Sequence, residues 1–594
     1  MWLMKRTKKS SNRFVVVAVV ATMLLLTLSL RLSAQPIVSF SHDGGCYPSP
    51  IRLALELDLS VDLAADNQDY VIRYTLNGSA PDANSPCYRK PFLLDEKCYS
   101  RSNIYKIQNA PDEHWYCPEE VERIIVVRAA AFDQNGKRCS EVFTESYVIE
   151  SLLGRKIHVA IVSLCVDSVD LFDYQNGIFV PGATFDPKEI TTTGNYYRRG
   201  RAHEKAAHFE FFEDGGEDRV AQDCGFRTHG NISRRYAQKG ISLYARAEYG
   251  EKNFKGIWND VKDKRLVLRP FCSAWTQAGV QNYFCQMLVP YAGLKFDALN
   301  CKPVVLFLNG EYWGLYYLEE KPDEKLISKR YRLDPQSVRM VQDWAGHSDD
   351  GFDSSFVAMM QWVAKTDFSD DAQYTKIQQQ VDIESFIDYI LFETYIGNRD
   401  WPANNMRCWS ADGSPWRFIF FDGDAVRTTQ FKAVANAVSA DTTVVYPTSA
   451  ESTLLLRKLM ENKQFRKRFH DRMVDLYTQK LRWKSGGVFG IGDGVAPLFG
   501  VVRDDICREI AAQSARFGYP TSEKEWNKAM KKQKRYFKRR ARVVRREWEQ
   551  YLATMEGRPS SRGSLLLILS AVLAVIIASA AVAYRCLRRS SRGR

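Results

Sequence analysis

The chain has 594 residues, of which 45% are hydrophobic and 12% aromatic, and its formal net charge is +13. This composition excludes wholesale disorder, collagen-like repeats and coiled coils, and the length predicts at least two hydrophobic cores. The charge suggests nucleic acid at first, but the basic residues are concentrated in three segments, 1–13, 523–549 and 585–594. The rest of the chain carries about −5. The sequence therefore predicts no nucleic-acid partner.

Both ends of the chain carry long uncharged segments. Residues 14–30 follow a basic N-terminus, so 1–34 is predicted to be a secretory signal peptide or a signal anchor. Residues 565–584 have the length of a transmembrane helix, and the tail 585–594 is basic and predicted to be cytoplasmic. Because basic flanks stay in the cytoplasm, we expect a membrane localisation with the main domains extracytoplasmic.

Residues 36–150 are predicted to form a small all-β sandwich. Apolar and polar residues alternate along 70–76, and Asn77-Gly78 then signals a hairpin turn. A second β-rich run spans 124–131. The cysteines of this region predict one or two disulfides, with the pairing left open.

The character of the sequence changes at about residue 157. Strands are expected at 158–164 and 240–246, and Asn309-Gly310 predicts another hairpin turn. Helical periodicity dominates after about residue 354, for example at 383–396. Strands followed by helices predict a two-lobed α+β domain over 157–555.

A basic segment at 528–546 predicts the last helix of this domain. Its apolar residues fall near one helical stripe, which includes Met530, Phe537, Ala541, Val544, Trp548 and Tyr551. We expect this stripe to pack on the domain and the basic face to remain solvated.

The strongest chemical signal lies between residues 398 and 424. Asp400 and Asn405 have the Asp-x4-Asn spacing of a protein-kinase catalytic loop, with Arg399 just before the aspartate. After a predicted strand, Asp422-Gly423-Asp424 stands where a kinase has its magnesium-binding Asp-Phe-Gly. Phosphoryl transfer needs such a set, because one carboxylate orients the acceptor hydroxyl and the other oxygens hold the metal.

Lys239 is the candidate for a lysine that contacts nucleotide phosphates. It opens a predicted strand after a loop that contains Gly230, Asn231 and Ser233, and such a loop can cover phosphates. An ordinary lysine at a strand end is the alternative interpretation.

Residues 157–555 resemble the spore-coat protein H (CotH) kinase family, a group of atypical protein kinases. The resemblance rests on motifs that agree in order and spacing. They are Phe-Arg-Thr-His-Gly-Asn-Ile-Ser-Arg at 226–234, Gln-Lys-Gly-Ile-Ser at 238–242, Tyr-Gly at 249–250, Asn-Gly-Glu-Tyr-Trp-Gly-Leu-Tyr at 309–316, Glu-Glu at 319–320, Asn-Arg-Asp-Trp-Pro-Ala-Asn-Asn at 398–405, Trp416 and Asp-Gly-Asp at 422–424.

The resemblance implies an atypical protein Ser/Thr kinase that depends on ATP and on Mg²⁺ or Mn²⁺. By this analogy Asp400 is the catalytic base, and Asn405 and Asp422 hold the metal. Asp424 would assist at the metal. The partner implied is a protein substrate with a Ser or Thr acceptor.

For the nucleotide, the resemblance implies that Lys239 contacts the phosphates and that Trp416 stacks on adenine. The sequence departs from the kinase scheme in one respect. No acidic residue lies between Arg269 and Asp297, so the helix expected to pair with the lysine lacks its glutamate. Glu319 or Glu320 could substitute for it.

The N-terminal region 36–150 also resembles the β-sandwich module at the C-terminus of chitobiase and β-hexosaminidase enzymes. The resemblance rests on 72–81, 85–88 and Tyr147. It implies a spacer without catalytic residues, with glycan or cell-wall contact as the alternative role.

Whether the chain is an active enzyme is left open by the sequence. A catalytically inactive kinase fold, acting as a cell-surface or glycan-binding structural protein, is the main alternative, because an extracytoplasmic domain meets little ATP. A glycoside hydrolase is disfavoured, since the chitobiase-like module is the non-catalytic one and no second carboxylate motif accompanies it.

Overall fold

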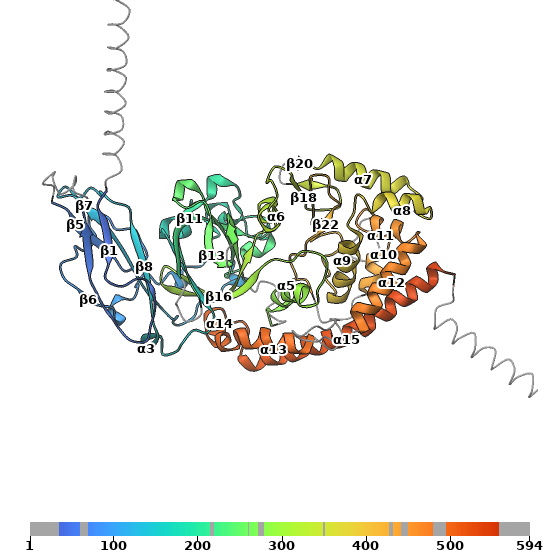
Figure 1. Ribbon diagram of the computed structural model, residues 1–594. Coiled ribbons are helices and arrows are strands. Elements are labelled where there is room, and N and C mark those ends of the chain that lie inside the picture. The colour runs from blue at the N-terminus through green and yellow to red at the C-terminus, as the bar shows by residue number, and fades with distance from the viewer. Residues whose placement is uncertain are drawn as a thin grey trace, which may run out of the picture. The chain divides into compact units, whose positions relative to one another are not determined.

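The computed structural model describes two compact units (Figure 1). Unit 1 comprises 1–260, 304–316 and 515–518, and unit 2 comprises 261–303, 317–514 and 519–594. The structure describes residues 35–59, 69–213, 219–258, 261–270, 278–348, 351–426, 432–440, 450–478 and 495–557.

Unit 1 begins with a β-rich region. A four-stranded sheet has the order β2 (Gly45–Tyr47), β8 (Phe143–Ile149), β7 (Ile125–Phe132), β5 (Val71–Thr75). Two strand pairs accompany it, β1 (Ile37–Phe40) with β4 (Leu55–Asp58) and β3 (Arg52–Leu53) with β6 (Phe92–Leu93). The strands predicted at 70–76 and 124–131 are β5 and β7.

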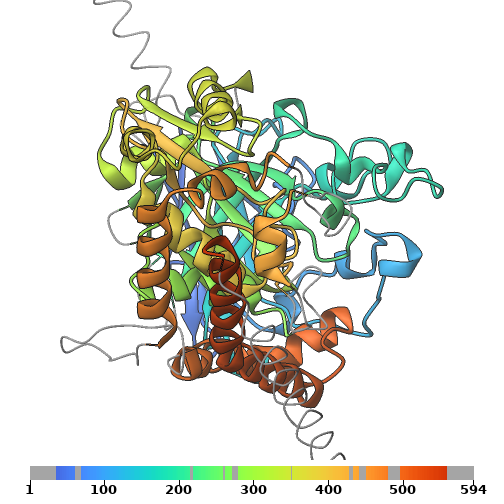
Figure 2. The ribbon, with the colours of Figure 1, turned by 90° about the vertical axis from the view of Figure 1, so that its right-hand side faces the viewer.

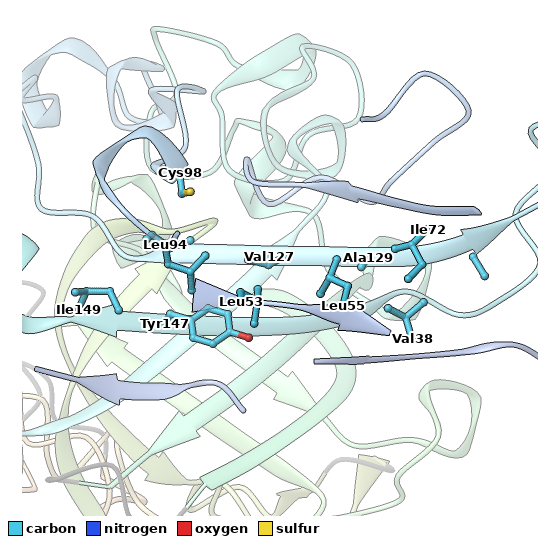
Figure 3. Close-up of a cluster of buried hydrophobic side chains, with 12 residues drawn as sticks. Val38, Leu53, Leu55, Ile72, Leu94, Cys98, Val127, Ala129, Tyr147 and Ile149 are labelled. Atoms are coloured by element: carbon cyan, nitrogen blue, oxygen red, sulfur yellow. The ribbon is translucent and has the colours of Figure 1, made fainter. Parts of the chain in front are cut away.

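The core of this region is built from the inward faces of these strands, as expected from alternating side-chain direction. Figure 3 shows Leu53, Leu55, Val127 and Tyr147 gathered between the strands. Tyr147 is fully buried, and its hydroxyl donates to the carbonyl of His42 at 2.9 Å.

The cysteines of this region correct one expectation. The disulfides expected here are not formed among Cys87, Cys98, Cys117 and Cys139, which are free cysteines. Cys98 instead belongs to the hydrophobic core.

Unit 1 contains a second sheet, whose first strand along the chain is β9. Its strands within this unit run in the order β16 (Cys301–Leu308), β9 (Ala160–Val166), β10 (Lys205–Phe212), β11 (Arg219–His229), β12 (Gly240–Tyr244). β16 is parallel to β9, and the other pairs are antiparallel. Asn309 and Gly310, with φ of 49° and 82°, form the predicted hairpin turn into β17 (Glu311–Glu320).

Unit 2 contains the helices that the periodicity after residue 354 predicts. Its small sheet has the order β18 (Val338–Val341), β21 (Cys408–Ala411), β22 (Arg417–Phe418). β15 (Arg265–Pro270) also belongs to this unit. Its helices are α5 (Gln281–Tyr291), α6 (Glu324–Tyr331), α7 (Ser354–Lys365), α8 (Asp371–Ile377), α9 (Ile383–Ile396), α10 (Ala433–Val438), α11 (Leu454–Leu459), α12 (Lys463–Thr478), α13 (Val495–Ile506) and α15 (Glu523–Met555). The helix α14 (Ile510–Phe517) begins in unit 2, and its residues from Ala515 onward belong to unit 1.

The last helix, α15, confirms the predicted amphipathic helix and supports the centre of unit 2. It packs against α9, α12 and α13 (Figures 1 and 2). Arg540 of α15 donates to the carbonyls of Thr394 and Tyr395, at 3.1 and 3.2 Å. Trp548 Nε1 donates to Thr394 Oγ1 at 3.2 Å. α15 therefore holds the C-terminal end of α9, from which the candidate catalytic loop continues.

The predicted membrane segments require a correction. Within the part of the chain that the structure describes, no helix has the length and apolar character needed to cross a bilayer. The segments 1–34 and 565–584, and the tail 585–594, lie outside the described residues. The predicted fold class is corrected to a mixed α/β structure with a β-rich N-terminal region, without support for flanking membrane segments. The predicted membrane localisation is likewise not supported.

Candidate functional site

The candidate catalytic loop begins where α9 ends. Gly397 stops the helix in the left-handed conformation, with φ of 68°. Asn398 then accepts a hydrogen bond from the amide of Asp400 through its side-chain oxygen, at 3.2 Å. The Asp400 carbonyl accepts from the amide of Asn404 at 2.8 Å. These local bonds give the loop a defined turn around Asp400.

The middle of the loop is anchored in the core of unit 2. Trp401 is 2% exposed, and its carbonyl accepts from the side-chain amide of Asn436 at 3.0 Å. The Pro402 carbonyl accepts from Trp344 Nε1 at 2.8 Å. A loop bonded from two sides in this way keeps its reactive side chains in a fixed position.

A second segment, after β22, lies against this loop. Asn398 and Val426 form an antiparallel bridge between the two segments. The side-chain amide of Asn405 donates to the backbone carbonyl of Asp422 at 3.3 Å. The charge of Asp400 contributes to the raised pKa of Asp424, after burial and Asp422. The structure thus brings together four of the predicted site residues: Asp400, Asn405, Asp422 and Asp424.

Arg269 joins the two acidic residues of the second segment. Its Nη2 donates to Asp422 Oδ1 at 2.6 Å and to Asp424 Oδ2 at 2.8 Å. The Arg269 side chain is 14% exposed. Burial opposes its charge, but Asp422 and Asp424 outweigh burial and hold its pKa well above the usual value. The sequence analysis did not identify this residue as part of the site.

Asn282 connects the helix α5 to the same group. Its side-chain amide donates to Glu319, and its side-chain oxygen accepts from the amide of Gly423 at 2.9 Å. Glu319 is 3% exposed, and burial raises its pKa to about 7, with Arg269 opposing the shift. The helix that lacks an acidic residue therefore contributes an amide, while the carboxylate comes from the end of β17.

The site carries more negative than positive charge. Burial raises the pKa of Asp424, Arg269 opposes this shift, and the neighbouring Asp422 and Asp400 add to it. Carboxylate and amide oxygens are suitable ligands for Mg²⁺ or Mn²⁺. Among the described residues, however, no three acidic, histidine or cysteine side chains form a ready-made metal cluster. The donor chemistry fits a divalent cation, and Arg269 bonds to two of the carboxylates that would hold it.

Two residues of the site have unusual backbone conformations. Asn405 and Asp422 have φ of 58° and 61°, in the left-handed region. Few residues other than glycine adopt this region, and asparagine and aspartate are among those that tolerate it. Such conformations persist where the surrounding structure enforces them, and they are concentrated at functional sites.

Lys239 belongs to unit 1 and is fully buried. Its Nζ donates to the carbonyls of Asn109, Arg234 and Tyr236, at 2.6, 2.9 and 2.9 Å. Burial lowers its pKa well below the usual value. An ammonium group has three hydrogens to donate, and each has a carbonyl acceptor here. The phosphate contact of Lys239 stays a prediction, and it requires Nζ to give up these carbonyls.

Trp416 belongs to unit 2 and lies in its core. It is 4% exposed, with its ring edge-on to Phe356 at 5.1 Å between centroids and 5.3 Å from the Arg339 guanidinium carbon. Stacking on adenine needs an open ring face. The stacking role of Trp416 stays a prediction, and it requires Phe356 or Arg339 to move.

Glu393 of α9 is a buried acid beneath the catalytic loop. It is 0% exposed, and burial raises its pKa to about 8, although Asn398 and Tyr389 favour its charged form. The folded protein therefore keeps a proton that the unfolded chain loses above the ordinary pKa of 4.5. Because the folded state binds more protons in this window, the free energy of unfolding falls as the pH rises from 4.5 to about 8.

We expect Glu393→Gln to remove this part of the pH dependence. At about pH 8.5 the variant should be more stable than the wild type by about 2–4 kcal/mol, and near pH 5 the two should be similar. Urea unfolding across this pH range measures the difference, with Glu384→Gln, an exposed position on the same helix, as the control. Equal pH slopes in wild type and Glu393→Gln would contradict the prediction.

Comparison with known families agrees with the geometry. A family model described as CotH kinase protein matches residues 226–544, more than half of the chain. A second model, described as Fn3 associated, matches residues 61–147. The N-terminal module is therefore similar to an Fn3-associated domain, and the finer chitobiase-like name is not supported. No curated protein matches the chain. From the match over 226–544, the chain belongs to the CotH kinase protein family.

Proposed function

We propose that the CotH kinase domain transfers the γ-phosphoryl group of ATP to a Ser or Thr hydroxyl of a protein acceptor, with Mg²⁺ or Mn²⁺ as cofactor. One observation carries the proposal: Asp422 and Asp424 both bond to Arg269, and the loop that holds Asp400 is joined to their segment by the Asn405–Asp422 bond and the Asn398–Val426 bridge. A single guanidinium does not neutralise these carboxylates. Such a site repels phosphate until a divalent cation is added.

The residues of the site have distinct roles in this proposal. Asp400 accepts the proton of the Ser or Thr hydroxyl. The hydroxyl oxygen attacks the γ-phosphorus, and ADP leaves. Asn405, Asp422 and Asp424 would hold the divalent cation through their side-chain oxygens. When bound, that cation neutralises phosphate charge. The core bonds of the Trp401-Pro402 segment keep Asp400 in position.

A second candidate is a kinase fold without phosphotransfer activity. The observation in its favour is that Arg269 already bonds to both Asp422 and Asp424. An arginine that remained there would exclude a metal. The two candidates differ in whether nucleotide binds in the presence of a divalent cation.

The test uses the full chain with ATP and either Mg²⁺ or Mn²⁺. If the proposal holds, the melting temperature rises with ligand concentration by mass action, equivalent to about 2.7 kcal/mol at 100 times Kd. Labelled phosphate is then transferred from ATP to a generic protein acceptor or to the chain itself. A melting temperature unchanged by ATP with either metal, together with no transfer, would refute the proposal and favour the inactive fold.

A further inference from the structure

Arg269 has the properties of a functional cation rather than a surface residue. It lies near the end of β15, 153 residues before Asp422 and 155 before Asp424. Both carboxylates bond to the same nitrogen, Nη2. The exposed fractions of the Asp422 and Asp424 side chains are 35% and 17%. The arginine is thus held at carboxylates that solvent and ions reach.

The guanidinium of Arg269 keeps donor capacity for another anion. Its Nε is buried and has no hydrogen-bond partner among the residues that the structure describes. Arginine commonly binds carboxylate or phosphate through two parallel N–H bonds. Here Nη2 alone donates to both carboxylates, so Arg269 does not bind either of them through two parallel N–H bonds.

The surroundings of Arg269 supply the acidic counterpart that a phosphate-contacting residue needs. Glu319 contributes to the raised pKa of Arg269, after Asp422 and Asp424. Asn282 holds Glu319 and the amide of Gly423, so the second carboxylate segment and Glu319 are linked through one side chain. Arg269, the buried Glu319 and Asn282 of α5 therefore belong to one group of interacting side chains. Lys239, in contrast, has a carbonyl acceptor for each of its three donors.

We propose that Arg269 is the phosphate-contacting residue of the nucleotide site and that, without nucleotide, it competes with the divalent cation for Asp422 and Asp424. This inference rests on the function proposed above. With the side-chain oxygens of Asp422 and Asp424 holding the divalent cation, the guanidinium of Arg269 would leave them. The released guanidinium then has its donors available for the phosphate oxygens of ATP. Arg269 pairs with the carboxylates in the resting site and with the phosphates in the loaded site.

The test compares Arg269→Gln and Arg269→Lys with the wild type, in the full chain, by two binding measurements. The first is the affinity for Mn²⁺ alone, by calorimetry. Arg269→Gln should bind Mn²⁺ about tenfold more tightly, because the competing cation is gone. The second is the affinity for a fluorescent ATP analogue at saturating Mg²⁺. It should fall about tenfold or more in Arg269→Gln, and Arg269→Lys should recover part of it.

Arg503→Gln, at an exposed arginine paired with Asp504, is the matched control and should change neither affinity. Mn²⁺ affinity unchanged in both Arg269 variants would overturn the competition, and unchanged nucleotide affinity would overturn the phosphate contact. If the wild type binds no nucleotide while Arg269→Gln still gains Mn²⁺ affinity, the proposed kinase function and the phosphate contact fail but the competition stands. If Arg269→Gln does not fold, the affinities of Arg269→Lys for Mn²⁺ and for the ATP analogue test the proposal instead.

Discussion

Asp400→Asn is expected to lower the rate of phosphotransfer by about 10³-fold, because the amide cannot accept the proton of the acceptor hydroxyl. The substitution keeps the size of the side chain. Two bonds of the loop come from the Asp400 backbone, to Asn398 and Asn404, and the substitution leaves both groups in place. Folding should therefore be preserved, and nucleotide affinity should be similar or slightly higher, since one carboxylate near Asp424 is removed.

Single-turnover transfer of labelled phosphate, with nucleotide affinity measured separately, tests this expectation. Asp471→Asn is the control, because Asp471 is an exposed acid on α12 paired with Lys467. It should leave both quantities unchanged. Transfer within tenfold of the wild type in Asp400→Asn would exclude Asp400 as the base, and equal losses of binding and transfer would instead indicate a damaged site.

Lys239→Met is expected to lower the free energy of unfolding by about 3–5 kcal/mol, because three buried carbonyls lose their donor and each unsatisfied group costs about 1–3 kcal/mol. The methionine fills much of the space but leaves the carbonyls of Asn109, Arg234 and Tyr236 without their donor. Each buried unpaired carbonyl carries a desolvation cost. The Nζ also lies 4.4 Å from the Tyr196 ring centroid, a contact that the substitution removes.

Urea unfolding followed by tryptophan fluorescence measures the loss. Lys255→Met, at an exposed lysine paired with Glu251 in the same unit, should change stability by about 0.5 kcal/mol or less. A Lys239→Met protein with wild-type stability and a large loss of nucleotide affinity would contradict the structural role. It would instead support the phosphate contact that the sequence predicts.

Lys239 and Arg269 show what motif spacing can predict about this site and what it cannot. Lys239 stands at the position that the family resemblance assigns to a phosphate contact, yet its side chain is buried and bonded to three backbone carbonyls. Arg269 lies outside every sequence motif that predicts the site. A charged residue near the end of the apolar run Leu266–Leu268 was the one available signal, because a buried arginine requires an acidic partner. The identity of that partner is not a local property.

Local sequence determined the features that depend on neighbouring residues. These include strands β5 and β7, the turn at Asn309-Gly310, helix α9 and the apolar stripe of α15. Side-chain periodicity and turn chemistry act over a few residues, so they can be read without a fold. The order and spacing of Asp400, Asn405 and Asp422 are likewise visible in the sequence without knowledge of the fold.

Tertiary structure alone decided which charges meet. The Arg269–Asp422 pair spans 153 residues, and the bond from Lys239 to Asn109 spans 130. Charge pairing depends on distance and burial in space, and neither has a period along the chain. The acidic residues of the site were therefore predictable from their motifs, whereas the arginine that pairs with them was selected by the packing of β15 and the segment after β22.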